Sequence, residues 1–425
     1  MSERNLKMYL KRDIEKTILD AETSFQAIVI YGARQVGKST TVDALFGNRF
    51  ASVTLDDANE RELALTNPKG FLEVHPWPLI VDEVQKAPNL LSEIKIAIDE
   101  QRKTWLKSNH PRQLMYVLTG SNQFELQAGI SESLAGRAAV FNMSSLTQIE
   151  AAGLSGSPFI PDISLLLKKE TDSSARYKTK SQIFDTIFKG GMPDIVVGNS
   201  RRNVYFKSYF DTYIAKDVMR LIAASHEMQF RNFVSYLALR TAQQVNYQVF
   251  ARELGINVDT IKRWISILVT SGIIVLLEPF MANVSNRIIK APKLYFMDTG
   301  LCAYLCKWPN ARMLEEGVMG GAFFETFVVS ETIKGYYNAG IDVTSHLYYY
   351  RDIDQREIDL LYVDENAIYP IEIKKGETPN KPTKNFNVLL KYNMEIKPGL
   401  VVDCCDKIRP INDKAYTFPV YLLGA

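Results

Sequence analysis

Residues 26–40 read QAIVIYGARQVGKST, and this stretch decides the fold. The first six residues are an apolar run, rich in β-branched side chains, that ends at a glycine, as a buried parallel strand does. The loop that follows has two glycines, a lysine and a hydroxyl residue at the spacing of a phosphate-binding loop. Residues 41–46 continue as a helix. The sequence therefore predicts a strand, a phosphate-binding loop and a helix in direct succession.

Each residue type in this loop suits the binding of a polyphosphate. Glycines let backbone N–H groups close on phosphate oxygens, and the start of the following helix adds a favourable dipole. Lys38 reaches the β- and γ-phosphates, and the Ser39 hydroxyl is a ligand for Mg²⁺, an ion that keeps most of its own waters. We expect ATP and Mg²⁺ as cofactors. The predicted binding residues are Gly32, Ala33, Arg34, Gln35, Val36, Gly37, Lys38, Ser39 and Thr40.

A second apolar run, residues 78–81, ends in Asp82 and Glu83. Two carboxylates then lie at the carboxyl edge of a predicted strand, where α/β sheets hold their ligands. Asp82 is the expected Mg²⁺ residue, and Glu83 is expected to orient and deprotonate the attacking water. Such a strand end is commonplace alone, but it becomes a strong signal downstream of a complete phosphate loop.

Two further strands are predicted at 51–55 and 113–118, and the second is followed by Thr119, Gly120, Ser121 and Asn122. If these strands share one sheet, a polar side chain from Thr119, Ser121 or Asn122 falls between the water and the γ-phosphate. We name Asn122 as the catalytic candidate. A simple polar turn is the alternative for any single one of them.

Arg137 precedes another predicted strand, residues 138–141. An arginine supplied in cis or in trans stabilises the charge that develops during phosphoryl transfer. Arg137 is therefore the candidate for this role, with a surface salt bridge as the alternative.

The order of these motifs, followed by Leu134-Ala135-Gly136-Arg137, resembles a family of bacterial and archaeal AAA-type ATPases. In that family the C-terminal half is a winged helix followed by a restriction-endonuclease-like domain. The resemblance covers nearly the whole chain and implies an α/β fold with a parallel P-loop NTPase sheet, then a helical subdomain, a winged helix and an α/β nuclease-like domain. The expected boundaries are 1–150, 151–225, 226–300 and 318–425.

The sequence composition and the predicted secondary structure change twice in the middle of the chain. Residues 151–182 are rich in Ser, Gly, Pro, Lys and Thr and are expected to form a loop-rich connection. From 226 to 297 the pattern is helix, helix, turn, helix and then two strands at 273–277 and 293–297, which is helix-turn-helix spacing with a wing. Lys262, Arg263 and the basic loop between the strands make DNA a candidate partner, and packing against protein is the alternative.

The last block is predicted to be a helix from 320 to about 336 followed by a mixed sheet, with strands at 347–350, 357–363, 368–374, 399–403 and 417–423 and a helix near 384–392. Asp359 and Glu372 are candidates to share a Mg²⁺, with Lys374 activating the water for phosphodiester hydrolysis. The resemblance adds Glu325 as the helical acidic position, with Glu331 as a substitute. A charged edge strand without activity is the alternative.

The composition of the chain limits the class of protein and the kinds of partner. The chain has 425 residues, of which 46% are hydrophobic and 23% charged, as in a globular protein of two to four domains. The formal charge of +2, from 50 basic and 48 acidic residues, gives no strong general attraction to polyanions. No apolar run approaches the roughly 18 residues of a membrane span, and no signal peptide is visible. We expect a cytoplasmic protein without a membrane.

Two functions remain in competition. The first is an ATPase coupled to DNA binding or processing. The second is a nucleotide-driven switch or scaffold that changes its homo-oligomeric assembly or binds a protein partner, with an inactive C-terminal domain. With four histidines in the chain, no Ser/His/Asp set or metal-ligand spacing favours a metabolic enzyme.

Overall fold

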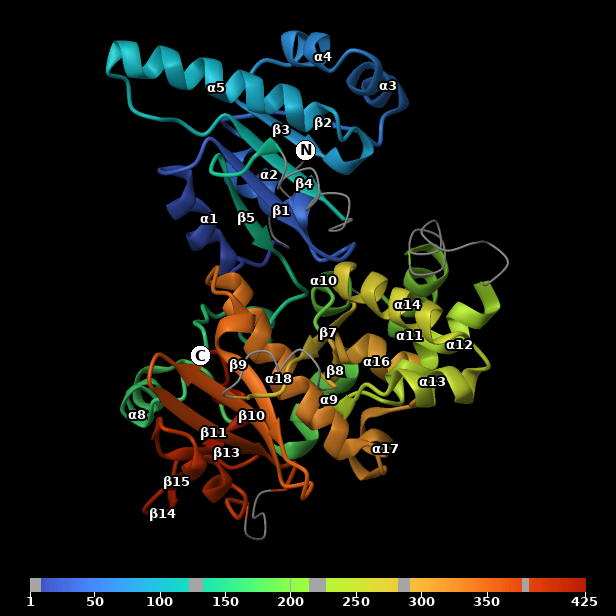
Figure 1. Cartoon of the computed structure of the whole chain (residues 1–425), viewed down its shortest axis with the longest axis vertical. Coiled ribbons are helices and arrows are strands. Elements are labelled where there is room, and N and C mark those ends of the chain that lie inside the picture. Colours follow the sequence, from blue (N-terminus) through green and yellow to red (C-terminus); the bar gives the residue numbers. More distant parts are fainter. Residues whose placement is uncertain (1–8, 122–132, 199, 214–226, 282–290, 377–381) are drawn as a thin grey trace. The chain divides into compact units, whose positions relative to one another are not determined.

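The computed structural model describes residues 9–121, 133–198, 200–213, 227–281, 291–376 and 382–425. The chain divides into two compact units. Unit 1 comprises Met1–Ser145 with two short segments, Thr270–Gly272 and Tyr337–Gly340. Unit 2 comprises Leu146–Val269, Ile273–Tyr336 and Ile341–Ala425. Figure 1 labels the elements of both units.

Unit 1 is built on a parallel sheet that has five strands among the described residues, in the order β2-β3-β4-β1-β5. The strands are β1 (Ala27–Tyr31), β2 (Ala51–Thr54), β3 (Leu79–Asp82), β4 (Tyr116–Gly120) and β5 (Ala138–Asn142). All five strands were predicted within a few residues. Their parallel direction brings every carboxyl end to one edge of the sheet, and β4 lies between β3 and β1.

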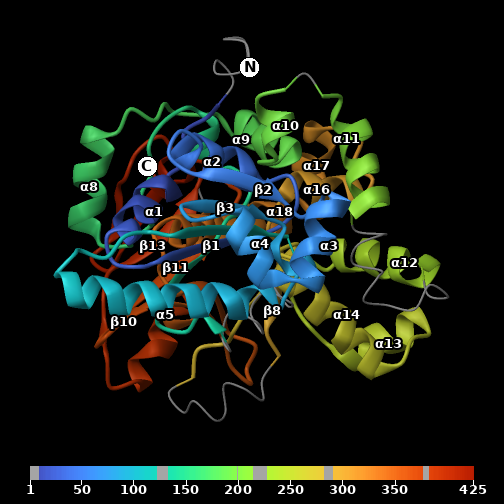
Figure 2. The ribbon, with the colours of Figure 1, turned by 90° about the horizontal axis from the view of Figure 1, so that it is seen from above.

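Helices cover both faces of this sheet, as Figure 2 shows for α5 and α2 on opposite sides. The helices are α1 (Ile14–Glu22), α2 (Lys38–Phe46), α3 (Ala58–Thr66), α4 (Pro68–Val74) and α5 (Leu90–Ser108). Side chains alternate along a strand, so Ala27 and Val29 share one face and pack in a single apolar core with Ile94 and Ile98 of α5. Burial on both faces explains why β1 is apolar throughout.

Unit 2 begins with short helices. They are α7 (Gln148–Ala151), α8 (Ile163–Asp172), α9 (Lys180–Lys189), α10 (Pro193–Val196) and α11 (Arg202–Tyr209). The prediction of a loop-rich connection over 151–182 missed α8. This helix starts where the Asp162 carboxylate accepts a hydrogen bond from the Leu165 amide, and it buries Leu166. The single buried leucine leaves too weak an apolar period for the sequence to reveal the helix.

The three predicted helices and two predicted strands follow in order, with an additional strand of two residues that was not predicted. The helices are α12 (Glu227–Ala238), α13 (Tyr247–Leu254) and α14 (Val258–Thr270), and the antiparallel sheet has the order β6-β8-β7, from β6 (Gln243–Gln244), β7 (Ile274–Leu277) and β8 (Lys293–Phe296). Trp264 of α14 is buried against Phe230 and Phe233 of α12, as expected for a core residue. Three basic residues lie in or beside the loop between β7 and β8, which was predicted as a candidate DNA contact. Arg287 and Lys290 lie outside the described residues, and Lys293 is buried and so does not present its charge to a partner.

The C-terminal part of unit 2 has a mixed sheet, as predicted, with the order β14-β15-β13-β11-β10-β9 and β12 paired to β11. Its strands are β9 (Leu347–Arg351), β10 (Glu357–Asp364), β11 (Ala367–Ile373), β12 (Glu395–Ile396), β13 (Gly399–Asp403), β14 (Pro410–Asn412) and β15 (Ala415–Pro419). Helices α16 (Thr299–Leu305), α17 (Ala311–Glu316) and α18 (Gly320–Asn338) precede it.

The helix predicted near 384–392 is a 3-10 helix over Phe386–Lys391. The prediction of the last strand was wrong in its bounds. The last strand ends at Pro419, and Val420–Leu422 turn as a 3-10 helix, because proline cannot donate the ladder hydrogen bond that would continue the strand. Within the described residues, no helix combines the length and apolar character needed to cross a bilayer.

Candidate active site

The phosphate loop needs glycine at both of its ends. Gly32 has a φ of +152°, and a Cβ atom there would lie 2.0 Å from the carbonyl oxygen of Met143. Gly37 has a φ of +100° and directly precedes α2, a conformation that side-chain-bearing residues rarely adopt. The two glycines that identify the motif in the sequence therefore each have a local steric reason.

Lys38 is folded back onto its own loop. Its Nζ atom donates to the carbonyl oxygens of Gly32, at 2.9 Å, and Ala33, at 2.8 Å. The side chain is buried, and burial lowers the pKa of Lys38 to about 8, against the opposing effect of Glu83 and Asp82. A buried ammonium held by neutral carbonyls is well placed to exchange them for phosphate oxygens.

The Asp82 carboxylate accepts hydrogen bonds from two hydroxyl groups of neighbouring segments. Ser39 donates from 3.2 Å and 3.3 Å to the two carboxylate oxygens, and Thr119 on β4 donates to the same carboxylate. The predicted Mg²⁺ residues Ser39 and Asp82 therefore do meet at the carboxyl edge of the sheet. One hydroxyl and one carboxylate fit Mg²⁺, because this ion retains several waters and takes few protein ligands.

Glu83 is held in an unusual backbone conformation beside Asp82. Its φ of +59° is left-handed, which is uncommon for a residue with a side chain and clusters at functional sites. The Ser121 hydroxyl donates to its Oε2 from 3.0 Å, and the Gln85 amide donates to the same oxygen. Ser121 is thus one of the polar residues after β4 that was predicted to face this region. Asn122, the named candidate, lies outside the described residues.

Arg137 does not lie near the loop of its own chain, so of the two ways of acting that the sequence left open, action in trans stays a prediction. It directly precedes Ala138, which pairs with Ala27 at the amino end of β1, whereas the loop follows Tyr31 at the carboxyl end. Four to five residues of strand separate the two edges by about 16 Å. Arg137 instead binds Asp99 of α5 with two hydrogen bonds, of 2.7 Å and 2.8 Å, which hold the pKa of the Asp99 carboxyl below its usual value.

Sequence reasoning missed Arg12. This buried guanidinium donates to the carbonyl oxygen of Val36 in the loop, at 2.8 Å, and to that of Ser144 after β5, at 2.9 Å. An arginine that precedes a helix carries no local sign of such a role. Only its burial beside a segment 132 residues away reveals it.

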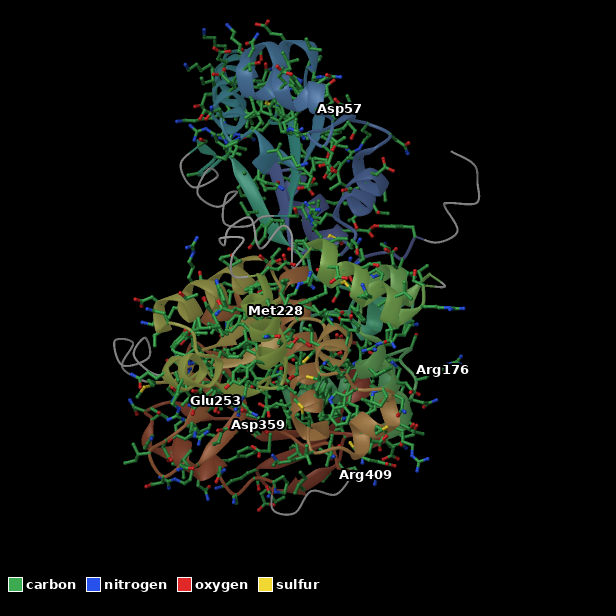
Figure 3. The ribbon with its side chains drawn as sticks, turned by 90° about the vertical axis from the view of Figure 1, so that its right-hand side faces the viewer. Asp57, Arg176, Met228, Glu253, Asp359 and Arg409 are labelled. Carbon is green, nitrogen blue, oxygen red and sulfur yellow. The ribbon has the colours of Figure 1, made fainter. Side chains whose placement is uncertain are left out.

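In unit 2, the structure brings together the residues predicted for a nuclease-like site. Asp359 of β10, labelled in Figure 3, accepts from the Ile373 amide at 2.9 Å. Lys374 forms ion pairs with Glu372, at 2.6 Å, and with Asp359, at 3.4 Å. Burial, with the negative charge of Asp359, raises the pKa of Glu372 to about 7.

Glu325 of α18 interacts electrostatically with Asp359 and Glu372, and it pairs with a second lysine. Lys293 of β8 is buried and pairs with Glu325 at 2.8 Å and with Glu357 at 2.5 Å. Tyr295 also donates to Glu325, at 2.7 Å, and burial raises the pKa of Glu325 to about 7. Glu331, the substitute candidate, instead pairs with Lys334 and the Gln148 amide.

The predicted Mg²⁺ pair of this region fits a metal less well than the pair in unit 1. The ammonium of Lys374 already bridges Asp359 and Glu372. Across the part of the chain that the structure describes, no set of three or more His, Cys, Asp and Glu side chains is arranged to hold a metal ion.

Comparison with known proteins agrees with the architecture of unit 1. Residues 24–152 match the model of the AAA domain, residues 180–312 match the domain of unknown function DUF8612, and residues 320–423 match the domain of unknown function DUF4143. With the loop, the acidic strand end and the sheet order, the first match defines an AAA-type P-loop ATPase-like domain.

Similar whole chains are known from mycobacteria. The uncharacterized proteins Rv2008c of Mycobacterium tuberculosis and Mb2031c of Mycobacterium bovis are each 25% identical over 377 residues, which are 87% of this chain and 75% of theirs.

Solved structures with similarity include the Walker-type ATPase PABY2304 of Pyrococcus abyssi, with 13% identity and a TM-score of 0.39 over 70% of this chain and 96% of that chain. They also include a variant of RuvB from Thermotoga maritima, with 13% identity and a TM-score of 0.28 over 65% of this chain and 89% of that chain.

Proposed function

We propose that this chain binds and hydrolyses ATP in unit 1. The observation that carries the proposal is the chain of polar contacts at the carboxyl edge of the sheet, where Asp82 and Glu83 each hold a hydroxyl group from the end of β4, next to the loop. A strand end with no catalytic role has no need of a left-handed glutamate with two donors on one carboxylate oxygen.

Each residue of this site has a separate role in the proposed reaction. The loop amides and Lys38 bind the phosphates, and Lys38 gives up its contacts with Gly32 and Ala33 to do so. Ser39 and Asp82 would hold Mg²⁺, which would supply neutralisation of the phosphate charge. Glu83 orients a water for attack on the γ-phosphate and accepts its proton.

Lys38→Ala tests the proposal. Loss of a charge-assisted contact to phosphate is expected to weaken ATP binding at least about tenfold. Binding of a fluorescent ATP analogue and phosphate release are measured for the wild type, for Lys38→Ala and for Lys107→Ala, an exposed lysine at the end of α5 that serves as the control. Wild-type protein that does not bind ATP, or a Lys38→Ala variant that binds and hydrolyses like the control, would contradict the proposal.

A second candidate function is Mg²⁺-dependent cleavage of DNA in unit 2. It is favoured by the convergence of Glu325, on α18, with Asp359, Glu372 and Lys374, on or directly after the paired strands β10 and β11. In addition, the Oε2 atom of Glu372 is buried and has no hydrogen-bond partner among the described residues. Buried carboxylate oxygens are rarely left so, which supports a ligand at this position.

Glu372→Ala decides this candidate. Cleavage of single-stranded, duplex and branched DNA is followed with Mg²⁺ and with EDTA, and Glu395→Ala on the exposed edge of β12 is the control. We expect cleavage in the control and its loss in Glu372→Ala. Equal cleavage by both variants, or no cleavage by the wild type on any of these substrates, rules the nuclease candidate out.

A further inference from the structure

Arg12 joins three parts of unit 1 that are distant in the sequence. Arg12 is 3% exposed, and its guanidinium contacts Val36 in the phosphate loop and Ser144 after β5. Its own backbone is fixed as well, because the Arg12 amide and the Tyr9 hydroxyl both donate to Glu15, at 2.5 Å and 2.8 Å. Burying the charge of Arg12 costs free energy, and an apolar side chain at this position would avoid that cost.

The contact with Val36 bears on phosphate binding through the geometry of one peptide group. In a trans peptide the C=O and the following N–H point in opposite directions. Arg12 holds the Val36 carbonyl, so it fixes the orientation of the Gly37 amide on the other side of that plane. Loop amides of this kind are the donors that bind phosphate. A cationic donor on the carbonyl also polarises the peptide in the direction that strengthens its N–H.

The contact with Ser144 connects the loop to the end of unit 1. Ser144 lies two residues before Leu146, where unit 2 begins in the sequence. The same short segment approaches the other end of the loop, because the Met143 amide donates to Tyr31 at 2.8 Å and the Met143 carbonyl blocks the Cβ position of Gly32. Residues 143–144 therefore contact the loop region at its start directly and near its end through Arg12.

We propose that Arg12 is a positioning residue for phosphate binding that also couples the loop to residues 143–145. The inference rests on the proposed ATP binding in unit 1. Arg12 does not touch the nucleotide. It sets the peptide between Val36 and Gly37, and a shift of that peptide on phosphate binding is transmitted to Ser144 through the two arms of one rigid guanidinium.

Binding measurements test the positioning role. The ligands are a fluorescent ATP analogue with Mg²⁺ and, in competition, tripolyphosphate, which has the phosphates but no base or sugar. Arg12→Met is expected to weaken both at least about tenfold, because the Gly37 amide is then no longer held in the orientation that donates to phosphate. Arg12→Lys, which keeps the charge but cannot bridge both carbonyls with a planar fork, is expected to fall between. Arg49→Met is the control, since Arg49 is half-exposed and pairs with Glu22.

The outcomes are distinguishable. If the wild type binds neither ligand, the proposed ATP binding fails. If the wild type binds and folded Arg12→Met binds both ligands within about twofold of the wild-type affinity, the positioning role is overturned. A role in stability alone would lower the unfolding temperature without changing the affinity measured well below that temperature.

Hydrogen exchange on the wild type tests the coupling and does not depend on any variant folding. With Mg²⁺ and a non-hydrolysable ATP analogue, slower exchange is expected at the amides of residues 32–39 and of residues 143–145. Protection of the loop with no change at 143–145 would refute the coupling. In Arg12→Lys, the protection from exchange at the amides of residues 143–145 is expected to be lost before the protection at residues 32–39.

Discussion

At the scale of single residues, Glu83 combines a strained backbone with two hydrogen-bond donors on one carboxylate oxygen. The donors are Ser121, from the end of the neighbouring strand, and Gln85, from the turn that follows Glu83. A carboxylate fixed in this way has a defined direction, which is what a residue that orients a water requires. The left-handed φ of +59° costs free energy that the surrounding contacts must offset.

Glu83→Gln is expected to separate binding from hydrolysis. The amide has the size of the carboxylate but cannot take a proton from water, so the turnover number should fall by about 10²- to 10⁴-fold while ATP affinity stays within a few-fold of the wild type. Phosphate release and binding of a fluorescent ATP analogue measure the two quantities. A large loss of affinity would show that Glu83 serves the nucleotide or the fold rather than the water.

At the scale of elements, α18 and β8 contribute opposite charges to the carboxylate group of unit 2. Glu325 on α18 meets Lys293 on β8, and the lysine also pairs with Glu357 on β10. Burial alone would lower the pKa of Lys293, but Tyr295, Glu325 and Asp359 hold it well above its usual value. The three-stranded sheet and the mixed sheet are thus joined by an ion pair that is largely withdrawn from water.

This arrangement predicts a pH dependence. Burial raises the pKa of Glu325 to about 7 from 4.5, so its contribution to stability is fully present below pH 4.5 and is lost as pH rises through 7. Lowering the pH from 8 to 5.5 should therefore raise the free energy of unfolding of the wild type by at least about 1 kcal/mol more than that of Glu325→Gln.

Urea unfolding at the two pH values measures the difference, with the exposed Glu395→Gln as the control. The control should follow the wild type. An identical pH response in Glu325→Gln and the wild type would mean that Glu325 does not titrate in this range.

At the scale of the whole molecule, Arg137 can reach a phosphate only from another copy of the chain, since it lies at the amino edge of its own sheet. If it acts in trans, Arg137→Ala and Glu83→Gln each lose hydrolysis alone. A mixture of the two should recover part of it, because some interfaces then combine an intact Glu83 with an intact Arg137. Phosphate release by the separate and mixed proteins measures the effect.

Asp99→Ala serves as the control for this mixing experiment. Its carboxylate holds Arg137 through two hydrogen bonds. If loss of Asp99 reduces hydrolysis as much as loss of Arg137, and mixing restores nothing, then Arg137 only ties β5 to α5.

The rival function, a nucleotide-driven switch, also belongs to this scale. Glu83→Gln protein that still changes its assembly on ATP binding would behave as a switch, whereas a motor should lose its output in the same variant. Size-exclusion chromatography with and without ATP follows the assembly. The absence of any change in either nucleotide state would rule the switch out.

Much of unit 1 could be predicted because its signals are local. The apolar run of β1, the glycines of the loop and the Asp82-Glu83 strand end are each confined to a few consecutive residues, and each has a direct physical reason in the structure. In unit 2 the longer strands were predicted by the same means, but the short strands β6, β12 and β14 were not. Helix α8 was also missed, since one buried leucine gives no readable period.

What the sequence by itself determined was therefore the chemistry available: a phosphate loop, a pair of carboxylates at a strand end and a second acidic group with a lysine. Only the tertiary structure decided how these groups combine. Strand order placed β4 between β3 and β1, which delivers Thr119 to Asp82 and Ser121 to Glu83. The fold also places Arg137 at the far edge of the sheet and brings Arg12 to a site that no motif indicated. It buries Lys293, which the sequence placed beside a basic loop, in an ion pair with Glu325. The physical reason is that these contacts join residues 24 to 132 positions apart, so they depend on which surfaces pack together and leave no local pattern.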